Sequence, residues 1–353
     1  MDFQDAVNLF EKEEFGKAEK ILRPLAVADN AHAQLYMAIM YINGQGVAKN
    51  LEQAIQWLRS ASENGLAEAQ EMLGMSYASG RGVEQNFQQA AHWYQKAADQ
   101  GNADSELNLG LLYAKGQGVD EDQQHAIALY RRAAERGQAT AQFNLANRYH
   151  VGHGVRQDYA QAIFWYRASA NQGHAVSQLN LGTLYENGQG ITQDDTEAFS
   201  LYLKAAEQGY AEAQYLVGAR FETGKGVAQD YKQAAYWYDK ATLQGNVRAQ
   251  VSLGNLYHFG RGVPKNDRAA IGVYSLAALQ GNAIAQFNIG IRHYLGEGVE
   301  KDIVVAHAWF NIASTHGHED GKKNCDALEV EMSAQEISEA LVIAKKWMQA
   351  NRP

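Results

Sequence analysis

A short Gly-x-Gly-Val motif recurs eight times along this chain, once with Ile in place of Val, and the interval between copies is always 36 residues. A fixed period of this length is typical of an array in which each unit stacks on its neighbours. Because the interval never changes, we expect no inserted loop that carries a separate active site. The copies begin at Gly44, Gly80, Gly116, Gly152, Gly188, Gly224, Gly260 and Gly296.

Glycine is confined almost entirely to four columns of this repeat. We number each unit from position one, which is residue 31 and every 36th residue after it, and 30 of the 33 glycines then fall at positions 8, 14, 16 and 35. Positions 14, 16 and 35 are expected to end helices or form turns with positive φ. Glycine at position 8 lies inside a helix, where it costs ~1 kcal/mol relative to alanine. We therefore expect two helix backbones to approach closely there.

The remaining columns predict two helices in each unit. Positions 24, 27, 28 and 31 have helical spacing, and they carry alanine and aromatic residues that we interpret as core rather than as a cofactor-stacking surface. Position 20 is always Asn or Asp, which are favoured helix N-caps. Each unit is therefore predicted to hold one helix at about positions 2–13 and another at about positions 20–33.

The unit at residues 67–102 shows the pattern most completely, with Ala69-Gln70, Leu73-Gly74, Tyr77, Gly80-Arg81-Gly82-Val83, Ala90, Trp93-Tyr94, Ala97-Ala98 and Gly101. This pattern resembles the SEL-one-like repeat family, a relative of the tetratricopeptide repeat, and the resemblance covers residues 31–318. It implies an all-α, right-handed superhelix (a solenoid) of about 20 antiparallel helices. It also implies service as an adaptor or scaffold.

We expect three parts: an N-terminal capping hairpin at 1–30, eight repeats, and C-terminal capping helices at 319–353. Pro24 should kink or shorten the second helix of the first hairpin. Ser333 and Glu336 form a capping box, and an apolar stripe follows it at Ile337, Ala340, Leu341, Ala344 and Trp347. The repeats are predicted at 31–66, 67–102, 103–138, 139–174, 175–210, 211–246, 247–282 and 283–318.

The charge balance argues against nucleic acid and anionic membranes as partners, because 40 acidic and 31 basic residues give a net charge of −9 and no basic run occurs. No apolar run is long enough for a transmembrane helix. The single cysteine excludes an intramolecular disulfide framework, and the first residues do not read as a signal peptide. We expect a cytoplasmic protein, or a periplasmic one if a signal has been removed from this chain.

No catalytic, metal-binding or cofactor-binding residue is predicted. The Gly-x-Gly-Val motif follows a helix and lacks the Gly-Lys-Ser/Thr ending that a phosphate-binding loop needs. The pairs His150 with His153 and His316 with His318 lack the spacing of a zinc site. Cys325 is expected to be a buried thiol rather than a nucleophile.

The first helix of each repeat is expected to bind the partner, because in tetratricopeptide-like superhelices it lines the concave groove. Positions 3, 4, 7, 8 and 11 of that helix pack, so positions 2, 5, 6, 9 and 13 should face the groove with position 10 at its flank. Exposed Met and Tyr would form an apolar contact patch. The Asn residues would bind a peptide backbone or hold neighbouring hairpins together. The predicted binding residues are Tyr36, Ile39, Met40, Met72, Met75, Asn108, Asn144, Asn147, Arg148, Asn180, Arg220, Asn255, Asn288 and Arg292.

These observations predict a non-enzymatic scaffold that binds a protein or peptide in the groove. One alternative is an immunity protein that neutralises a lipase-type effector of a bacterial contact-dependent (type VI) secretion system, as some family members do. A weaker alternative is binding or hydrolysis of β-lactams, as in cysteine-rich relatives whose paired cysteines this chain lacks.

Overall fold

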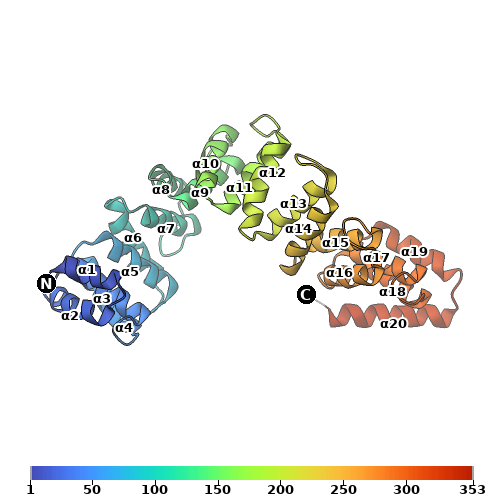
Figure 1. Cartoon of the computed structure of the whole chain (residues 1–353), viewed down its shortest axis with the longest axis horizontal. Helices are drawn as coiled ribbons and strands as arrows, with labels where there is room; N and C mark the ends of the chain where they lie inside the picture. The colour runs from blue at the N-terminus through green and yellow to red at the C-terminus, as the bar shows by residue number, and fades with distance from the viewer. Residues whose placement is uncertain (1, 352–353) are drawn as a thin grey trace. The chain divides into compact units, whose positions relative to one another are not determined.

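The computed structural model describes residues 2–351, and every regular element in that range is an α-helix. The chain forms two compact units, residues 1–174 (unit 1) and 175–353 (unit 2), which divide between the fourth and fifth repeats. Within each unit, consecutive helices pair as antiparallel hairpins that stack along the chain (Figure 1). The expected all-α solenoid of 20 helices is confirmed.

The helix bounds are α1 Phe3–Glu11, α2 Phe15–Val27, α3 Ala31–Asn43, α4 Leu51–Glu63, α5 Ala67–Ser79, α6 Phe87–Asp99, α7 Ala103–Lys115, α8 Gln123–Glu135, α9 Ala139–Val151, α10 Tyr159–Asn171, α11 Ala175–Asn187, α12 Asp195–Glu207, α13 Ala211–Thr223, α14 Tyr231–Leu243, α15 Val247–Phe259, α16 Asp267–Leu279, α17 Ala283–Leu295, α18 Ile303–Thr315, α19 Glu319–Glu329 and α20 Ala334–Ala350. From α3 to α18, odd numbers are the first helices of repeats and even numbers the second helices. All sixteen begin within one residue of the predicted positions.

Local chemistry explains these bounds. The Asn or Asp at position 20 accepts a hydrogen bond from a backbone N–H in the first turn of every second helix, as Asn50 does from Gln53 at 3.0 Å. The first helix ends at the position 14 glycine, which has left-handed φ, for example 63° at Gly116. These caps confirm the predicted start and end signals.

The second glycine of the loop packs one repeat against the next. A Cβ atom on Gly118 would lie 2.5 Å from the carbonyl oxygen of Phe87, where the second helix of the preceding repeat begins. Gly262 meets Tyr231 of its preceding repeat in the same way. The second glycine of the motif therefore allows close stacking between repeats in addition to forming the turn.

The glycine at position 8 lies close to both the backbone and an aromatic ring of the second helix. A Cβ atom on Gly110 would lie 2.8 Å from Cε1 of Tyr130, the position 28 tyrosine of the same repeat, and the nearest backbone atom, the Ala126 carbonyl oxygen, is farther away at 3.2 Å. The two helix backbones approach closely, as expected, and the aromatic ring of the second helix lies nearer still. A methyl group on Gly110 would crowd that ring in a close-packed core. Alanine occupies position 8 in the first and fourth repeats, at Ala38 and Ala146.

A buried amide at position 4 also joins the repeats. Gln70 donates to the Ser62 carbonyl of the preceding repeat at 3.0 Å and accepts from Gln100 of its own repeat at 2.8 Å. The third repeat replaces this amide pair by charges: Glu106 is fully buried and pairs with Arg136, at the position of Gln100, at 3.3 Å, and also with Arg132 at 2.7 Å. In both arrangements a polar partner offsets part of the cost of burial.

The two ends of the chain depart from the repeat pattern. Helix α2 keeps the 13 residues of the other second helices, so the expectation that Pro24 shortens it was wrong. Pro24 is exposed and lies in the last turn, where little helix follows that it could disrupt.

At the other end, α18 packs against both α19 and α20, and Trp309 contacts Trp347 with ring centres 5.1 Å apart. The predicted capping box at Ser333 is present. Ala340 and Ala344 of the predicted stripe are buried, whereas Leu341 is 45% exposed and lies outside the packed face.

Candidate partner-binding site

An open, mainly apolar pocket of about 400 Å³ lies in unit 1 where α5 meets its neighbours, and we call it the apolar pocket. Met72 and Met75 of α5 line it, and Asn108 of α7 closes one side. Met75 is 49% exposed, although large apolar side chains are normally buried. Three residues of the predicted binding set therefore line one pocket. The other lining residues are Ile42, Leu51, Ala54, Ile55, Ser76, Ala78, Ser79, Arg81 and Tyr94.

A second open pocket, of about 410 Å³, lies between α7 and α9, and we call it the basic pocket. Its lining includes the predicted residues Asn144, Asn147 and Arg148 of α9. Lys115, at the end of α7, adds a second cation. Within the described range 2–351, none of its lining side chains is acidic. The remaining lining residues are Leu111, Ala114, Tyr130, Val151 and His153.

Two intramolecular contacts position Arg148 in the basic pocket. Its guanidinium contacts Nδ1 of His153 and lies over the Tyr130 ring, 6.0 Å from the ring centre. Burial raises the pKa of the Tyr130 phenol, and the neighbouring charge of Arg148 opposes that rise. Arg148 itself is partly exposed. The side chain is thus held in place while its charge stays accessible.

The two pockets use equivalent positions of the second and fourth repeats. Each takes positions 6, 9, 10, 13 and 15 from one repeat and position 12 from the repeat before it. Sequence reasoning included positions 6, 9, 10 and 13 but missed 12 and 15. Position 12 gave a signal, since it changes from apolar to charged residues along the chain. It reads Ile42, Ala78, Ala114, His150, Glu186, Glu222, His258 and Tyr294.

The N-terminal part of the predicted apolar patch is not open. Met40 is fully buried in the core formed with α2, so its predicted exposure was wrong. Tyr36 is partly buried because Phe3 and Phe10 of α1 pack edge-on against its ring, at 5.7 and 5.1 Å. Ile39 is also partly buried. The first hairpin therefore covers much of the surface that α3 was expected to present.

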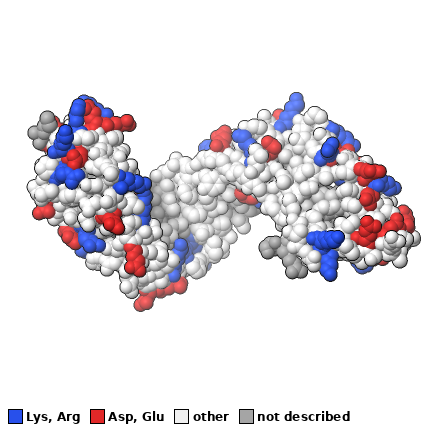
Figure 2. Space-filling model, turned by 90° about the horizontal axis from the view of Figure 1, so that it is seen from below, with Lys and Arg blue, Asp and Glu red and all other residues white. Residues whose placement is uncertain are grey.

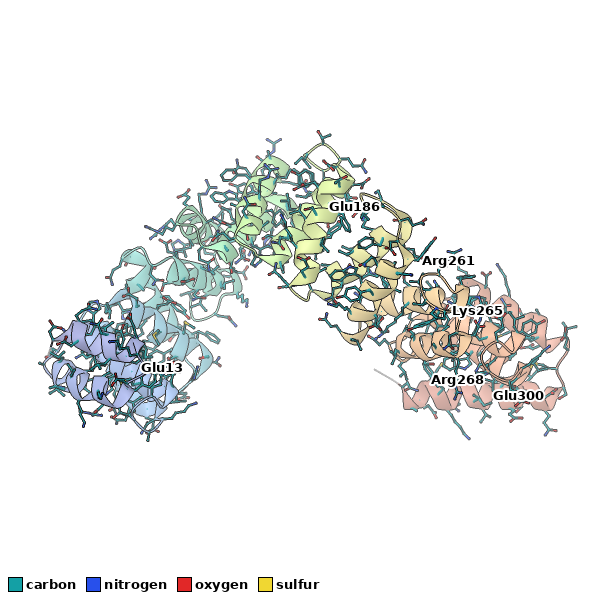
Figure 3. All side chains as sticks on the ribbon, viewed as in Figure 1. Glu13, Glu186, Arg261, Lys265, Arg268 and Glu300 are labelled. Atoms are coloured by element: carbon teal, nitrogen blue, oxygen red, sulfur yellow. The ribbon has the colours of Figure 1, made fainter. Side chains whose placement is uncertain are left out.

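The arginines of unit 2 are also buried rather than displayed. Arg220 is 6% exposed and forms ion pairs with Glu186, labelled in Figure 3, and with Asp195 at 3.9 Å. Although burial opposes ionisation, hydrogen bonds from Tyr202 and Arg220 leave the pKa of Glu186 below its usual value. The prediction that Arg220 faces a partner was wrong, because its charge is neutralised inside the protein.

Arg292 is the centre of a similar cluster and is 9% exposed. Its Nη1 lies 2.6 Å from Glu297 and 2.5 Å from Nδ1 of His258, and His258 in turn contacts Asp267 at 2.5 Å. The ligand-type atoms of His258, Asp267 and Glu297 lie within 4.8 Å of one another, close enough for one metal ion. The guanidinium of Arg292 already supplies a cation among these three side chains. Because Arg292 is buried in this cluster, the prediction that it faces a partner was wrong.

The predicted asparagines divide by their surroundings. Asn255 accepts a hydrogen bond from Tyr274 at 2.7 Å, and Asn288 bonds to the same phenol. Asn255 therefore joins the two helices of its own repeat, and Asn288 connects its repeat to the preceding one. Asn108, Asn144 and Asn147 line the pockets of unit 1. Asn180 is partly buried on α11.

The potential nucleophile is shielded. Cys325 is buried on α19, its thiol contacts the His307 carbonyl at 3.6 Å, and burial raises its pKa to about 11. The prediction of a buried thiol is confirmed. Within residues 2–351, no helix is both long and apolar enough to cross a membrane.

Comparison with known proteins assigns the repeat. The Sel1 repeat matches this chain at residues 31–66, 67–102, 103–138, 139–174, 175–210, 211–246, 247–282 and 283–318. The chain belongs to the Sel1 repeat family. Sel1 repeat proteins are generally non-enzymatic scaffolds, which supports a role in protein interaction. No curated relative matches the chain.

Solved structures of other Sel1 repeat proteins have the same architecture. The Escherichia coli protein c5321, a protective antigen of uropathogenic strains, is 30% identical over 99% of this chain and 84% of its own, with a TM-score of 0.61. A Sel1 repeat protein of Oxalobacter formigenes is 30% identical over 87% of this chain and 89% of its own, with a TM-score of 0.63. The immunity protein Pa5087 of Pseudomonas aeruginosa is 21% identical over 60% of this chain and 81% of its own, with a TM-score of 0.35.

Proposed function

We propose that this Sel1 repeat protein is a non-enzymatic scaffold that binds a partner protein across the apolar and basic pockets of unit 1. The observation that carries the proposal is the exposure of Met75 beside an open apolar pocket, with an accessible arginine on the equivalent surface two repeats later. Flexible Met side chains adapt to varied apolar partners, and Met and Arg are enriched in interfaces.

The contrast with unit 2 supports this choice of surface. There the arginines at the same repeat position are buried in ion pairs, so their charge is already satisfied within the chain. Acidic side chains of unit 2 gather instead over α19 and the start of α20, at the C-terminal end (Figure 2). Arg148 and Lys115, which have no carboxylate partner among residues 2–351, and the exposed Met75 all lie in unit 1.

A pair of surface substitutions tests this proposal. Met75→Glu places a charge in the apolar pocket, and Phe164→Glu makes the same change at a 59% exposed aromatic residue on α10, away from both pockets. A partner isolated with the wild-type chain should bind Met75→Glu at least about tenfold more weakly, the loss expected of an interface hot spot. Phe164→Glu should bind like the wild type, as measured by calorimetry.

Equal binding by both variants would show that the partner uses another surface. Circular dichroism of both variants checks that each remains as helical as the wild type, so that lost binding reports contact rather than unfolding.

A further inference from the structure

Three arginines occupy position 10 of alternate repeats, at intervals of 72 residues: Arg148, Arg220 and Arg292. The repeat therefore provides an internal comparison of one side chain in three surroundings. The positions that surround it are 12 and 21 of the preceding repeat and 15 of its own. Around Arg220 these are Glu186, Asp195 and Lys225; around Arg292 they are His258, Asp267 and Glu297; around Arg148 they are Ala114, Gln123 and His153.

In unit 2, carboxylates from these positions neutralise the arginine. Arg220 pairs with Glu186 and Asp195, and Arg292 lies 2.6 Å from Glu297 and 3.9 Å from Asp267. Both guanidinium groups are almost completely removed from solvent. The surroundings of position 10 in this repeat are therefore suited to pairing arginine with carboxylate.

In unit 1 the carboxylates are missing while the arginine is kept. Ala114 replaces the position 12 acid, and Gln123 donates to the Ala114 carbonyl at 2.9 Å instead of pairing with Arg148. Among residues 2–351, no carboxylate comes within ion-pair distance of Arg148; its contacts are His153 and Tyr130. Lys115, exposed on the same pocket, has no acidic partner in this range either.

We infer that the basic pocket is a receptor for an aspartate or glutamate side chain of a peptide segment of the partner. The ligand carboxylate takes the place that Glu186 and Asp195 hold beside Arg220. A guanidinium offers paired donors that match a carboxylate, and such charge-assisted hydrogen bonds are stronger than neutral ones. Lys115 adds charge, and the Asn144 and Asn147 amides supply further donors.

This inference rests on the proposed function and narrows the partner's chemistry. The ligand segment carries an acidic side chain for the basic pocket and an apolar side chain for the apolar pocket. The chain as a whole carries a net charge of −9, so the charge of this pocket is opposite to that of the rest of the protein. Charge complementarity then favours an acidic ligand at the pocket.

Selection from a library tests the inference without a known partner. A library of random 12-residue peptides displayed on phage is panned against the full-length protein and against Arg148→Gln. We expect the wild-type pool to be enriched in Asp and Glu, and the pool from Arg148→Gln to lose that enrichment. The strongest wild-type peptide is then synthesised with a fluorophore and titrated by fluorescence anisotropy.

The repeats supply a matched variant that retains the arginine. Ala114→Glu combined with Gln123→Asp copies the acids of the Arg220 cluster next to Arg148. The two introduced carboxylates should pair with Arg148 and take the place of the peptide carboxylate. The peptide should bind both this double variant and Arg148→Gln at least about tenfold more weakly. Arg156→Gln, which removes an exposed charge from the same repeat outside this pocket, should leave the dissociation constant unchanged.

The outcomes separate this inference from the proposed function. Enriched peptides without acidic residues, or acidic peptides that bind both pocket variants like the wild type, would overturn the carboxylate receptor and leave the scaffold proposal standing. If no peptide is enriched on the wild-type protein, both proposals fail. The double variant adds an ion pair and should keep the wild-type helicity, so its lost binding cannot be attributed to unfolding.

Discussion

Arginine at one repeat position is buried or accessible according to what the preceding repeat places beside it. Arg220 is buried because Glu186 and Asp195, from α11 and α12, supply compensating charge. Arg148 stays partly exposed because Ala114 and Gln123 supply none. Removing a charge from water is costly unless the charge is paired. Arginine at this position is therefore buried where the preceding repeat supplies a carboxylate and partly exposed where it does not.

The pairing of Glu186 predicts a pH dependence of stability. Its pKa is lowered in the folded protein, so its ionised form stabilises the fold above the unfolded value near 4.5, and this contribution is lost as the pH falls through the folded value. Glu186→Gln should lower the free energy of unfolding by roughly 1–3 kcal/mol near neutral pH, the usual contribution of charged hydrogen bonds. Urea denaturation at a series of pH values should show this deficit shrinking on acidification. A deficit that is the same at every pH would rule out the assigned charge.

At the scale of the helix, packing in the seventh repeat places a glycine of the first helix against a tyrosine of the second helix. In the seventh repeat, a Cβ atom on Gly254 would lie 2.6 Å from Cδ1 of Tyr274, whereas one on Gly272, also helical, would meet no atom within 4 Å. The same repeat thus holds a crowded and an uncrowded helical glycine.

These two glycines give a matched prediction. Gly254→Ala should destabilise the protein by about 1–3 kcal/mol, because a close-packed core tolerates an added methyl group poorly. Gly272→Ala should stabilise it by about 0.4–1 kcal/mol, because alanine lowers the entropy of the unfolded chain and favours the helix. Thermal and urea denaturation of the two variants would measure both effects. Two changes of the same sign would contradict the assigned contact.

The elements also show how far the sequence predicts the structure. Asn and Asp at position 20 and glycine at position 14 mark helix ends by local chemistry, so the helices were predicted to within a residue. Met40 could not be assigned correctly, because its burial depends on the packing of α2. Met75 was predicted to be exposed, and its side chain is 49% exposed. Periodicity gives the direction of a side chain, but contacts between repeats decide whether it is accessible.

At the scale of the whole molecule, the contacts within each unit run between helices that are neighbours in sequence, with α13 against α15 and α18 against α20 as extensions of that pattern. Each repeat is therefore stabilised by its own hairpin and by the adjacent hairpins. In such an array the total stability is approximately a sum of repeat and interface contributions. A local defect should remain local, which distinguishes this fold from one with a single shared core.

Hydrogen exchange tests that locality. Gly254→Ala should accelerate amide exchange in α15 and α16 and in the hairpins that contact them, because opening there costs less free energy. Exchange in α3 to α6, which belong to the other compact unit, should match the wild type. Mass spectrometry of peptic fragments resolves the two regions in one experiment. Equal acceleration in both regions would contradict this locality, because the effect would then extend beyond the adjacent hairpins.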